Sequence, residues 1–224
     1  MVAMMNFAPT TEDYGLLAMP LAAAAQAYER LFAAADQSLT RQNIEGKPSA
    51  LFHALEPLTM ALDRTMLIAH GPTWTSYFAN GLLGSDAVLP VSRIAAMNGC
   101  TGLRICRSSK ATLLEVYESP ERGGDGLNLR RTIYAAQDGK WTFGNSGTPY
   151  PFESTEQYTE KRIKDRFTPK HLDAMLDGLG APVTPLPPLD QHNAVLFVQD
   201  GAKASRLTLY SYAQVQAKEP WKRN

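Results

Sequence analysis

The fold is decided by the stretch from residue 65 to residue 152, which begins TMLIAHGPTWTSYFANGLLGSD and ends KWTFGNSGTPYPF. It holds most of the strand-like sequence of the chain, because β-branched and aromatic residues lie there between Gly, Pro and Asn turn signals. Its first part predicts a strand at 65–70, a break at Gly71-Pro72 and a second strand at 73–78.

The rest of this stretch predicts an antiparallel meander. Apolar and polar residues alternate along successive segments, as expected for strands that expose one face to water. Asp138-Gly139 is a strong hairpin signal between the last two segments. The four predicted strands cover residues 103–108, 111–118, 127–136 and 140–143.

Helices are predicted before, within and after this stretch. Pro20 begins a segment rich in strong helix formers with apolar residues at helical spacing, LAAAAQAYERLFAAADQSL. A second helix is expected to begin at Thr168-Pro169 and to end at Gly180. Further helices are predicted at 49–55, at 89–97 and over the strongly charged residues 154–166.

These elements predict an α+β fold, with residues 20–224 forming a single domain. We expect an antiparallel sheet of about five to seven strands with the helices mainly on one face. Residues 1–19 are interpreted as a mobile N-terminal segment, and residues 182–188 as an extended proline-rich connector. Strands at 194–199 and 207–212 are expected to extend the sheet or to form a separate hairpin on it.

The charge balance argues against nucleic-acid binding. The chain carries 22 Lys and Arg against 22 Asp and Glu, whereas nucleic-acid binders usually carry a basic excess that neutralises phosphates. No stretch approaches the roughly 18 apolar residues of a membrane span, and no basic segment followed by an apolar run marks a signal peptide. A cytoplasmic protein that binds neither nucleic acid nor membrane is therefore expected.

Cofactor and metal signatures are missing from the sequence. The chain has four histidines and two cysteines, at spacings that match no metal site. Gly123-Gly124-Asp125-Gly126 has neither the lysine nor the following helix of a phosphate-binding loop. Cys100 and Cys106 permit a disulfide, but a pair of reduced thiols is the commoner arrangement. We therefore expect no cofactor and no metal.

The candidate binding residues lie mainly in the first strand pair. Trp74 and Tyr77 alternate in orientation, so at least one aromatic side chain of this region is expected on the surface, where binding sites often place aromatic residues. His70 and Asn80, at the ends of these strands, complete this set. Arg166 is the fifth candidate, with a structural role favoured. We expect Arg166 or Arg162 to reach the region of Glu153 or of the Gly147 loop.

One enzymatic alternative uses His70. A His-Gly pair at a strand end, with Gly81-Leu82 about ten residues later, resembles the opening of ADP-ribosyltransferases of the histidine–tyrosine–glutamate kind. That resemblance implies that His70 holds the nicotinamide ribose and that a later glutamate assists transfer. Pro72 departs from this pattern, because a small hydroxyl residue is expected there. The later tyrosine and glutamate have no unique match in this sequence.

A second resemblance covers about residues 66–180. It rests on WTSYFANG at 74–81 with GSD at 84–86, GKWTF at 139–143 with GTP at 147–149, and the later PFE, Tyr158 and DRFTP. These motifs resemble a group of uncharacterised bacterial proteins, and small bacterial α+β proteins of this build are often immunity proteins. The resemblance implies a non-catalytic, cytoplasmic protein-binding module that neutralises a toxin. Its partner would be a protein, and a homodimer is compatible with it.

Overall fold

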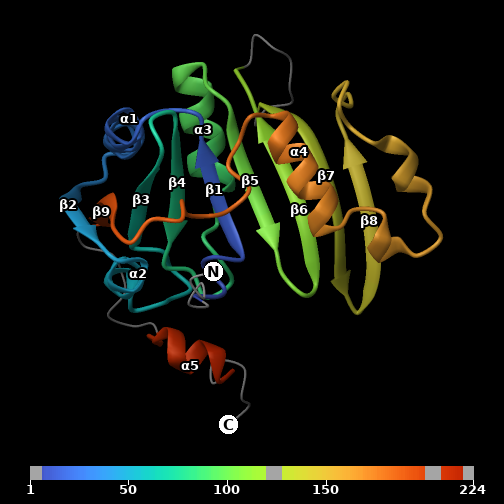
Figure 1. The fold of residues 1–224 in the computed structure, drawn as a ribbon. Coiled ribbons are helices and arrows are strands. Elements are labelled where there is room, and N and C mark those ends of the chain that lie inside the picture. Colours follow the sequence, from blue (N-terminus) through green and yellow to red (C-terminus); the bar gives the residue numbers. More distant parts are fainter. Residues whose placement is uncertain (1–6, 120–127, 200–207, 219–224) are drawn as a thin grey trace.

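A nine-stranded antiparallel sheet forms the centre of the molecule (Figure 1). The computed structural model describes residues 7–119, 128–199 and 208–218. The order across the sheet is β2-β9-β3-β4-β1-β5-β6-β7-β8. The strands are β1 (Asp13–Leu17), β2 (Leu39–Gly46), β3 (Arg64–His70), β4 (Trp74–Ala79), β5 (Gly102–Arg107), β6 (Ala111–Tyr117), β7 (Leu129–Asp138), β8 (Lys140–Ser146) and β9 (His192–Gln199).

The antiparallel sheet and the α+β class are confirmed, and so are the main predicted hairpins. β3 and β4 pair on either side of Gly71, and β5 to β8 form the predicted meander. Gly139 takes the positive φ of 70° that its turn requires. The predicted strand count of about five to seven is wrong, because the sheet has nine strands.

One strand that the sequence analysis missed is β1, at Asp13–Leu17. It lies between β4 and β5 in the middle of the sheet, so these residues do not belong to a mobile N-terminal segment. Gly15 lies under helix α3 (Val88–Asn98), where a Cβ atom would come within 2.6 Å of a Val91 methyl group. A short strand that contains Asp and Gly has a weak strand signal, which explains the error.

The other missed strand is β2, at Leu39–Gly46. It pairs with β9 along its whole length and forms one edge of the sheet. Most of its side chains are exposed, so the strand lacks the apolar alternation by which strands are recognised.

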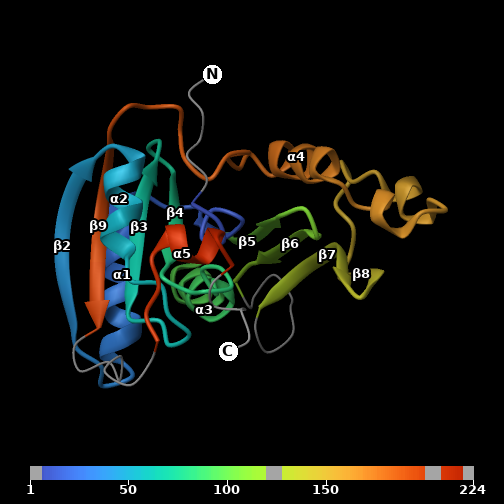
Figure 2. The ribbon, with the colours of Figure 1, turned by 90° about the horizontal axis from the view of Figure 1, so that it is seen from below.

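Helices cover both faces of the sheet, so the prediction that they lie mainly on one face is wrong. Helices α1 (Leu21–Ala33) and α3 share one core with Leu67 and Tyr77. Helices α2 (Pro48–Leu55), α4 (Pro169–Gly178) and α5 (Tyr212–Gln216) share the other core with Ile68 and Phe78. Figure 2 shows α3 and α4 on opposite sides. The physical reason is that neighbouring residues of β3 and β4 are apolar on both faces.

Two segments near the C-terminus differ from their predicted structure. Residues 154–166 form two short 3₁₀ helices, Thr155–Thr159 and Ile163–Asp165, because the charged sequence offers no apolar stripe to hold a longer helix. Residue 207 of the predicted strand at 207–212 lies outside the described residues. Tyr210 makes a single bridge with Leu58, and α5 begins at Tyr212.

No helix in the described ranges is both long enough and apolar enough to cross a membrane.

Candidate functional site

Two of the predicted binding residues are buried and have structural roles. Tyr77 is 1% exposed in the core beneath α1 and α3. Asn80 is 0% exposed; its Oδ1 accepts hydrogen bonds from the backbone N–H groups of Asp63 and Arg64, and its Nδ2 donates to the carbonyl of Pro57. Neither side chain is available to a partner on the surface.

His70 and Trp74 lie side by side and hold the proline-rich connector. They are cross-strand neighbours on β3 and β4. His70 Nε2 donates to the carbonyl of Thr184 at 3.1 Å, and Trp74 Nε1 donates to the carbonyl of Gly180 at 3.0 Å. Figure 1 shows this connector crossing in front of β1, β4 and β3 on its way from α4 to β9.

The chemistry of the connector explains this mode of attachment. Proline has no backbone N–H, so the connector cannot pair as a sheet strand but still offers its carbonyl groups. Ser76 Oγ donates to the carbonyl of Pro185 at 2.7 Å, which adds a third bond from the sheet. The connector is extended across the sheet, and side chains rather than backbone groups hold it there.

Arg166 lies at the far end of the sheet from this group. Its Nε donates to the carbonyl of Glu160 at 2.8 Å, and its guanidinium lies 5.8 Å from the centre of the Phe143 ring on β8. Arg162 pairs with Asp165 at 2.5 Å. Arg166 therefore contacts strand β8, but neither arginine bonds to Glu153 or to Gly147, where the sequence analysis expected one of them to reach.

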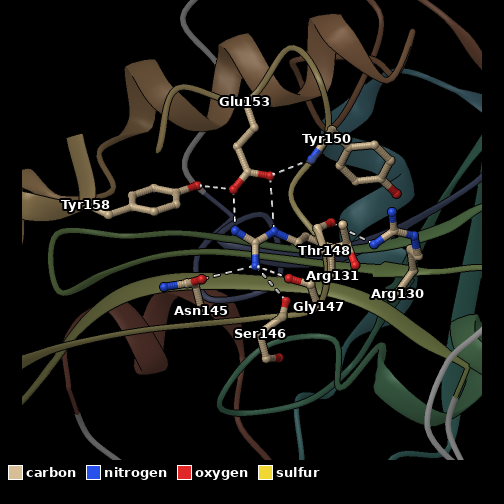
Figure 3. Close-up of polar contacts among 9 residues, drawn as sticks. All are labelled: Arg130, Arg131, Asn145, Ser146, Gly147, Thr148, Tyr150, Glu153 and Tyr158. Carbon is tan, nitrogen blue, oxygen red and sulfur yellow. Dashed lines mark hydrogen bonds and ion pairs between the residues drawn. The ribbon is translucent and has the colours of Figure 1, made fainter. Parts of the chain in front are cut away.

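Glu153 instead forms a buried ion pair with Arg131 of β7, which is called the Arg131–Glu153 lock below (Figure 3). The side chain of Arg131 is 0% exposed and that of Glu153 is 1% exposed. Arg131 donates through Nε to Glu153 Oε2 at 3.1 Å and through its second terminal nitrogen to Oε1. This two-bond geometry fixes the planes of both groups.

The remaining donors and acceptors of this lock fix the loop around it. One terminal nitrogen of Arg131 donates to the carbonyls of Ser146 and Gly147 at 2.7 and 3.1 Å, and to Asn145 Oδ1 at 3.2 Å. The Tyr158 hydroxyl donates to Glu153 Oε1 at 2.6 Å, and the Tyr150 N–H donates to Oε2 at 3.2 Å. Residues from 145 to 158 are thereby tied to one guanidinium.

The lock sets the protonation states of its members. Burial acts to raise the pKa of Glu153, but hydrogen bonds from Arg131, Tyr158 and the Tyr150 N–H outweigh it and hold the pKa below its usual range. Burial, with the neighbouring Glu153 carboxylate, raises the pKa of the Tyr158 hydroxyl. Both oxygens of Glu153 are engaged, so it is not free to act as a general acid or base.

A pocket of ≈ 140 Å³ lies between this loop and α4. Its apolar lining comes from the loop, from the residue before the helix cap and from the helix. Its polar lining includes Gln157, Lys170 and His171. The apolar members are Phe152, Phe167, Ala174 and Met175, together with the Tyr158 ring.

A glycine brings Phe152 against α4. A Cβ atom on Gly178 would meet the Phe152 ring at 2.3 Å, so the ring lies directly on the helix backbone. The same ring stacks on Tyr150, with centroids 5.2 Å apart, and Arg130 lies 5.0 Å from the Tyr150 ring centre. Phe152 is nevertheless 43% exposed, which makes it a large aromatic surface beside the pocket.

The polar members of the lining offer hydrogen bonds rather than reactive groups. His171 Nδ1 accepts the backbone N–H of Thr168 at 3.2 Å, and burial lowers the pKa of the ring. The neutral imidazole therefore carries its proton on Nε2. Gln157 Oε1 is buried and has no hydrogen-bond partner among the described residues.

A second charged cluster lies near α3 and joins three strands. Arg104 of β5 donates to both oxygens of Asp13 on β1, at 3.2 and 2.7 Å, and contacts Glu115 of β6 at 3.4 Å. The Tyr117 hydroxyl donates to Glu115 at 2.7 Å. One arginine thus bridges carboxylates on the two neighbouring strands, so the cluster serves to connect β1, β5 and β6.

Metal and thiol chemistry find no support in the part of the chain that the structure describes. It contains no group of three or more His, Cys, Asp or Glu side chains that could hold a metal ion. Cys100 and Cys106 are free thiols. Burial raises the pKa of Cys100 to about 11 and that of Cys106 to about 12, so neither is an activated nucleophile.

No protein-family model, curated protein or solved structure matches this chain. Its function is therefore inferred from the pocket and its surroundings.

Sequence reasoning did not find Arg131, Gln157 or the pocket. Arg131 and Glu153 are 22 residues apart and come from a strand and a loop. The sequence analysis expected an arginine near Glu153 or the Gly147 loop, but it named Arg166 or Arg162 instead of Arg131.

Proposed function

We propose that this chain is a protein-binding module that holds its partner on the surface formed by the loop from Tyr150 to Tyr158 and helix α4. The observation that carries this proposal is the ≈ 140 Å³ pocket in that surface. An exposed aromatic side chain, Phe152, lies beside it.

The size of the pocket favours a protein partner over a metabolite. Sites for small molecules and cofactors typically have volumes of about 300–1,000 Å³. A pocket of ≈ 140 Å³ is too small for such ligands but suits one side chain. Protein interfaces concentrate their binding energy in a few anchor side chains that fill such pockets.

The rigidity of the surface also supports binding. The Arg131–Glu153 lock and the stacking of Phe152 on Tyr150 hold the loop in one arrangement before any partner arrives. A surface that is already ordered loses little conformational entropy on binding, and that loss is one of the main costs of association.

Two narrower predictions from the sequence remain proposals. A toxin as the partner, and a cytoplasmic location, rest on the resemblance to small bacterial immunity proteins. The ADP-ribosyltransferase alternative gains no support from His70, because its Nε2 already donates to the carbonyl of Thr184.

The binding proposal is tested by filling the pocket. Ala174 lines it and is exposed on α4, so Ala174→Leu places three extra carbon atoms in the pocket without disturbing the core. Asp177→Leu adds a leucine at an exposed position three residues further on, outside the pocket lining, and is the matched control. Wild type and both variants are immobilised, and the proteins that they retain from an extract of the source cells are compared by mass spectrometry.

We expect a specific protein that is retained by the wild type and by Asp177→Leu but is lost with Ala174→Leu. If that protein is the chain itself, light scattering will show a dimer that Ala174→Leu dissociates. Retention of the same proteins by all three would contradict the proposed surface.

A further inference from the structure

Strand β2 forms a long and regular edge of the sheet. It spans eight residues, whereas strands typically have about five or six. It pairs with β9 at every position from Leu39 to Gly46 without a shift in register. Among the described elements it is the outermost on its side of the molecule (Figure 2). An edge strand of this kind can add a strand from another chain.

The devices by which proteins usually protect such an edge are missing from β2. A lysine or proline on the strand, a bulge or a very short strand each discourages pairing with another chain. The sequence of β2, LTRQNIEG, contains neither lysine nor proline, and its ladder with β9 has no bulge. The opposite edge, β8, begins with Lys140, and its Phe143 ring packs against Tyr158. Of the two edges, β2 is therefore the one suited to pairing.

The backbone groups that face outward on β2 belong to alternate residues. The N–H of Gln199 on β9 donates to the carbonyl of Asp63, so the odd-numbered residues of β9 face β3. Backbone groups of successive residues in a strand point to opposite sides, so the even-numbered residues of β9 face β2, where their Cα partners are even-numbered too. The odd-numbered residues Arg41, Asn43 and Glu45 therefore direct their N–H and C=O groups away from β9.

The charges on these outward-facing residues are complementary to a second copy of the same strand. In an antiparallel pair of β2 strands centred on Asn43, Arg41 of each copy lies directly opposite Glu45 of the other. Both side chains are exposed and lie on the same face of the sheet. Opposite charges at such cross-strand positions attract, whereas like charges repel. A pair centred on Arg41 or on Glu45 would instead place like charges against each other.

We propose that two copies of this chain pair through their β2 strands, antiparallel and about a two-fold axis at Asn43. The two nine-stranded sheets then form one continuous sheet. Arg41, Asn43 and Glu45 of each copy supply the backbone hydrogen bonds, and the two Arg41–Glu45 contacts between copies set the register. The contact lies at the opposite edge of the sheet from β7 and β8, which carry the loop of the proposed binding surface, so it goes beyond the proposed function.

The test measures the oligomeric state by sedimentation velocity at protein concentrations up to about 1 mM, a range that covers weak association. We expect the wild type to dimerise. Arg41→Glu and Glu45→Arg each turn both contacts between the copies into like-charge contacts, so each variant alone should dimerise about tenfold or more weakly. An equal mixture of the two variants should form a heterodimer, because it restores opposite charges at both contacts.

Three controls accompany the mixing experiment. Lys140→Glu on the opposite edge changes the net charge by the same amount as Arg41→Glu and should dimerise as the wild type does. The contact of Arg41 with Glu29 of α1 is absent from Arg41→Glu both alone and in the mixture, so its loss does not account for a rescue. Amide hydrogen exchange measured by NMR should slow at Arg41, Asn43 and Glu45 in the dimer relative to the Arg41→Glu monomer. Thermal unfolding verifies that each variant is folded.

The inference is overturned if the wild type stays monomeric throughout this range, or if the mixture associates no better than either variant alone. A dimer that Lys140→Glu weakens as much as Arg41→Glu also overturns it, because net charge rather than β2 would be responsible. A dimer that dissociates with Ala174→Leu but not with Arg41→Glu would place the contact on α4. That result would remove the pairing of β2 and support the proposed binding surface, so the two proposals fail separately.

Discussion

Arg131 and Glu153 form an ion pair whose side chains are 0% and 1% exposed, and this pair ties strand β7 to the loop that carries the proposed binding surface. Removing one partner of a buried pair leaves an uncompensated charge in the interior. The pair therefore controls both the stability of the fold and the shape of the pocket.

We expect Arg131→Met to lower the free energy of unfolding by about 3–5 kcal/mol, because the Glu153 carboxylate would be left buried without its cation. Urea unfolding monitored by circular dichroism measures this loss. The double variant Arg131→Met/Glu153→Leu should lose less than the two single variants together, since it leaves neither charge unpaired. A loss below about 1 kcal/mol for Arg131→Met would show that the pair is not a structural lock.

The turn after β8 depends on a glycine that no other residue can replace. Gly147 has a φ of 82°, and a Cβ atom there would lie 2.2 Å from the carbonyl oxygen of Arg130. Gly139 has a similar φ of 70°, but no atom within 4 Å of its Cβ position. Gly139→Ala should therefore cost about 1–2 kcal/mol from backbone strain alone, and Gly147→Ala clearly more. Equal thermal shifts for the two variants would contradict the close approach to Arg130.

The proline-rich connector should loosen when its side-chain donors are removed. Ser76 is buried, and Ser76→Ala leaves the carbonyl of Pro185 without that donor, so a loss of about 1–3 kcal/mol is expected in urea unfolding. Trp74→Phe removes the bond to Gly180 while keeping most of the ring, and should cost about 0.5–1.5 kcal/mol. Amide hydrogen exchange should speed up within residues 180–191 in both variants. Unchanged exchange there would mean that other contacts hold the connector.

Two histidines beside this connector, His70 and His192, should make the free energy of unfolding change with pH in the mildly acidic range. Burial lowers the pKa of His70, and the nearby His192 acts in the same direction. Burial also lowers the pKa of His192, whereas the Leu189 carbonyl acts to raise it. The unfolded chain therefore binds more protons than the folded chain below the ordinary histidine pKa of about 6.5. Their stabilising contribution is complete above that value and is lost as the pH falls through the lowered pKa of the folded state.

We expect the free energy of unfolding to fall between pH 7.5 and pH 5.5, and the fall to be smaller in His192→Leu. The control variant is His53→Leu, which removes a histidine on the exposed side of α2. His171→Leu is less suitable as a control, because the His171 ring lines the pocket. The same pH slope in His192→Leu and the wild type would show that His192 does not contribute.

Local patterns predicted a large part of the fold. The hairpin of β3 and β4 followed from the Gly-Pro break, and the start of α4 followed from Thr168 and Pro169. The missed strands β1 and β2 share a different property: their neighbours in the sheet come from distant parts of the chain. A strand that is held mainly by distant partners needs little strand propensity of its own.

At the candidate site, too, local sequence predicted some features, whereas contacts between distant residues decided the others. The sequence analysis expected an arginine to reach Glu153 or the Gly147 loop, and an arginine does bind there. The arginine predicted near Glu153 was Arg166 or Arg162, whereas the residue paired with Glu153 is Arg131. Arg131 pairs with Val116 of β6 and alternates along β7 with Ile133 and Ala135, which places it on the same face of the sheet as these two core residues.

The sequence by itself determined the local periodicity, the turns and the helix caps of this protein, because each depends on residues a few positions apart. Only the tertiary structure decided the order of the nine strands, the covering of both faces, and the meeting of Arg131 with Glu153 beside the pocket. The physical reason is that strand order and register are chosen by the sum of many distant contacts. No single segment encodes that sum.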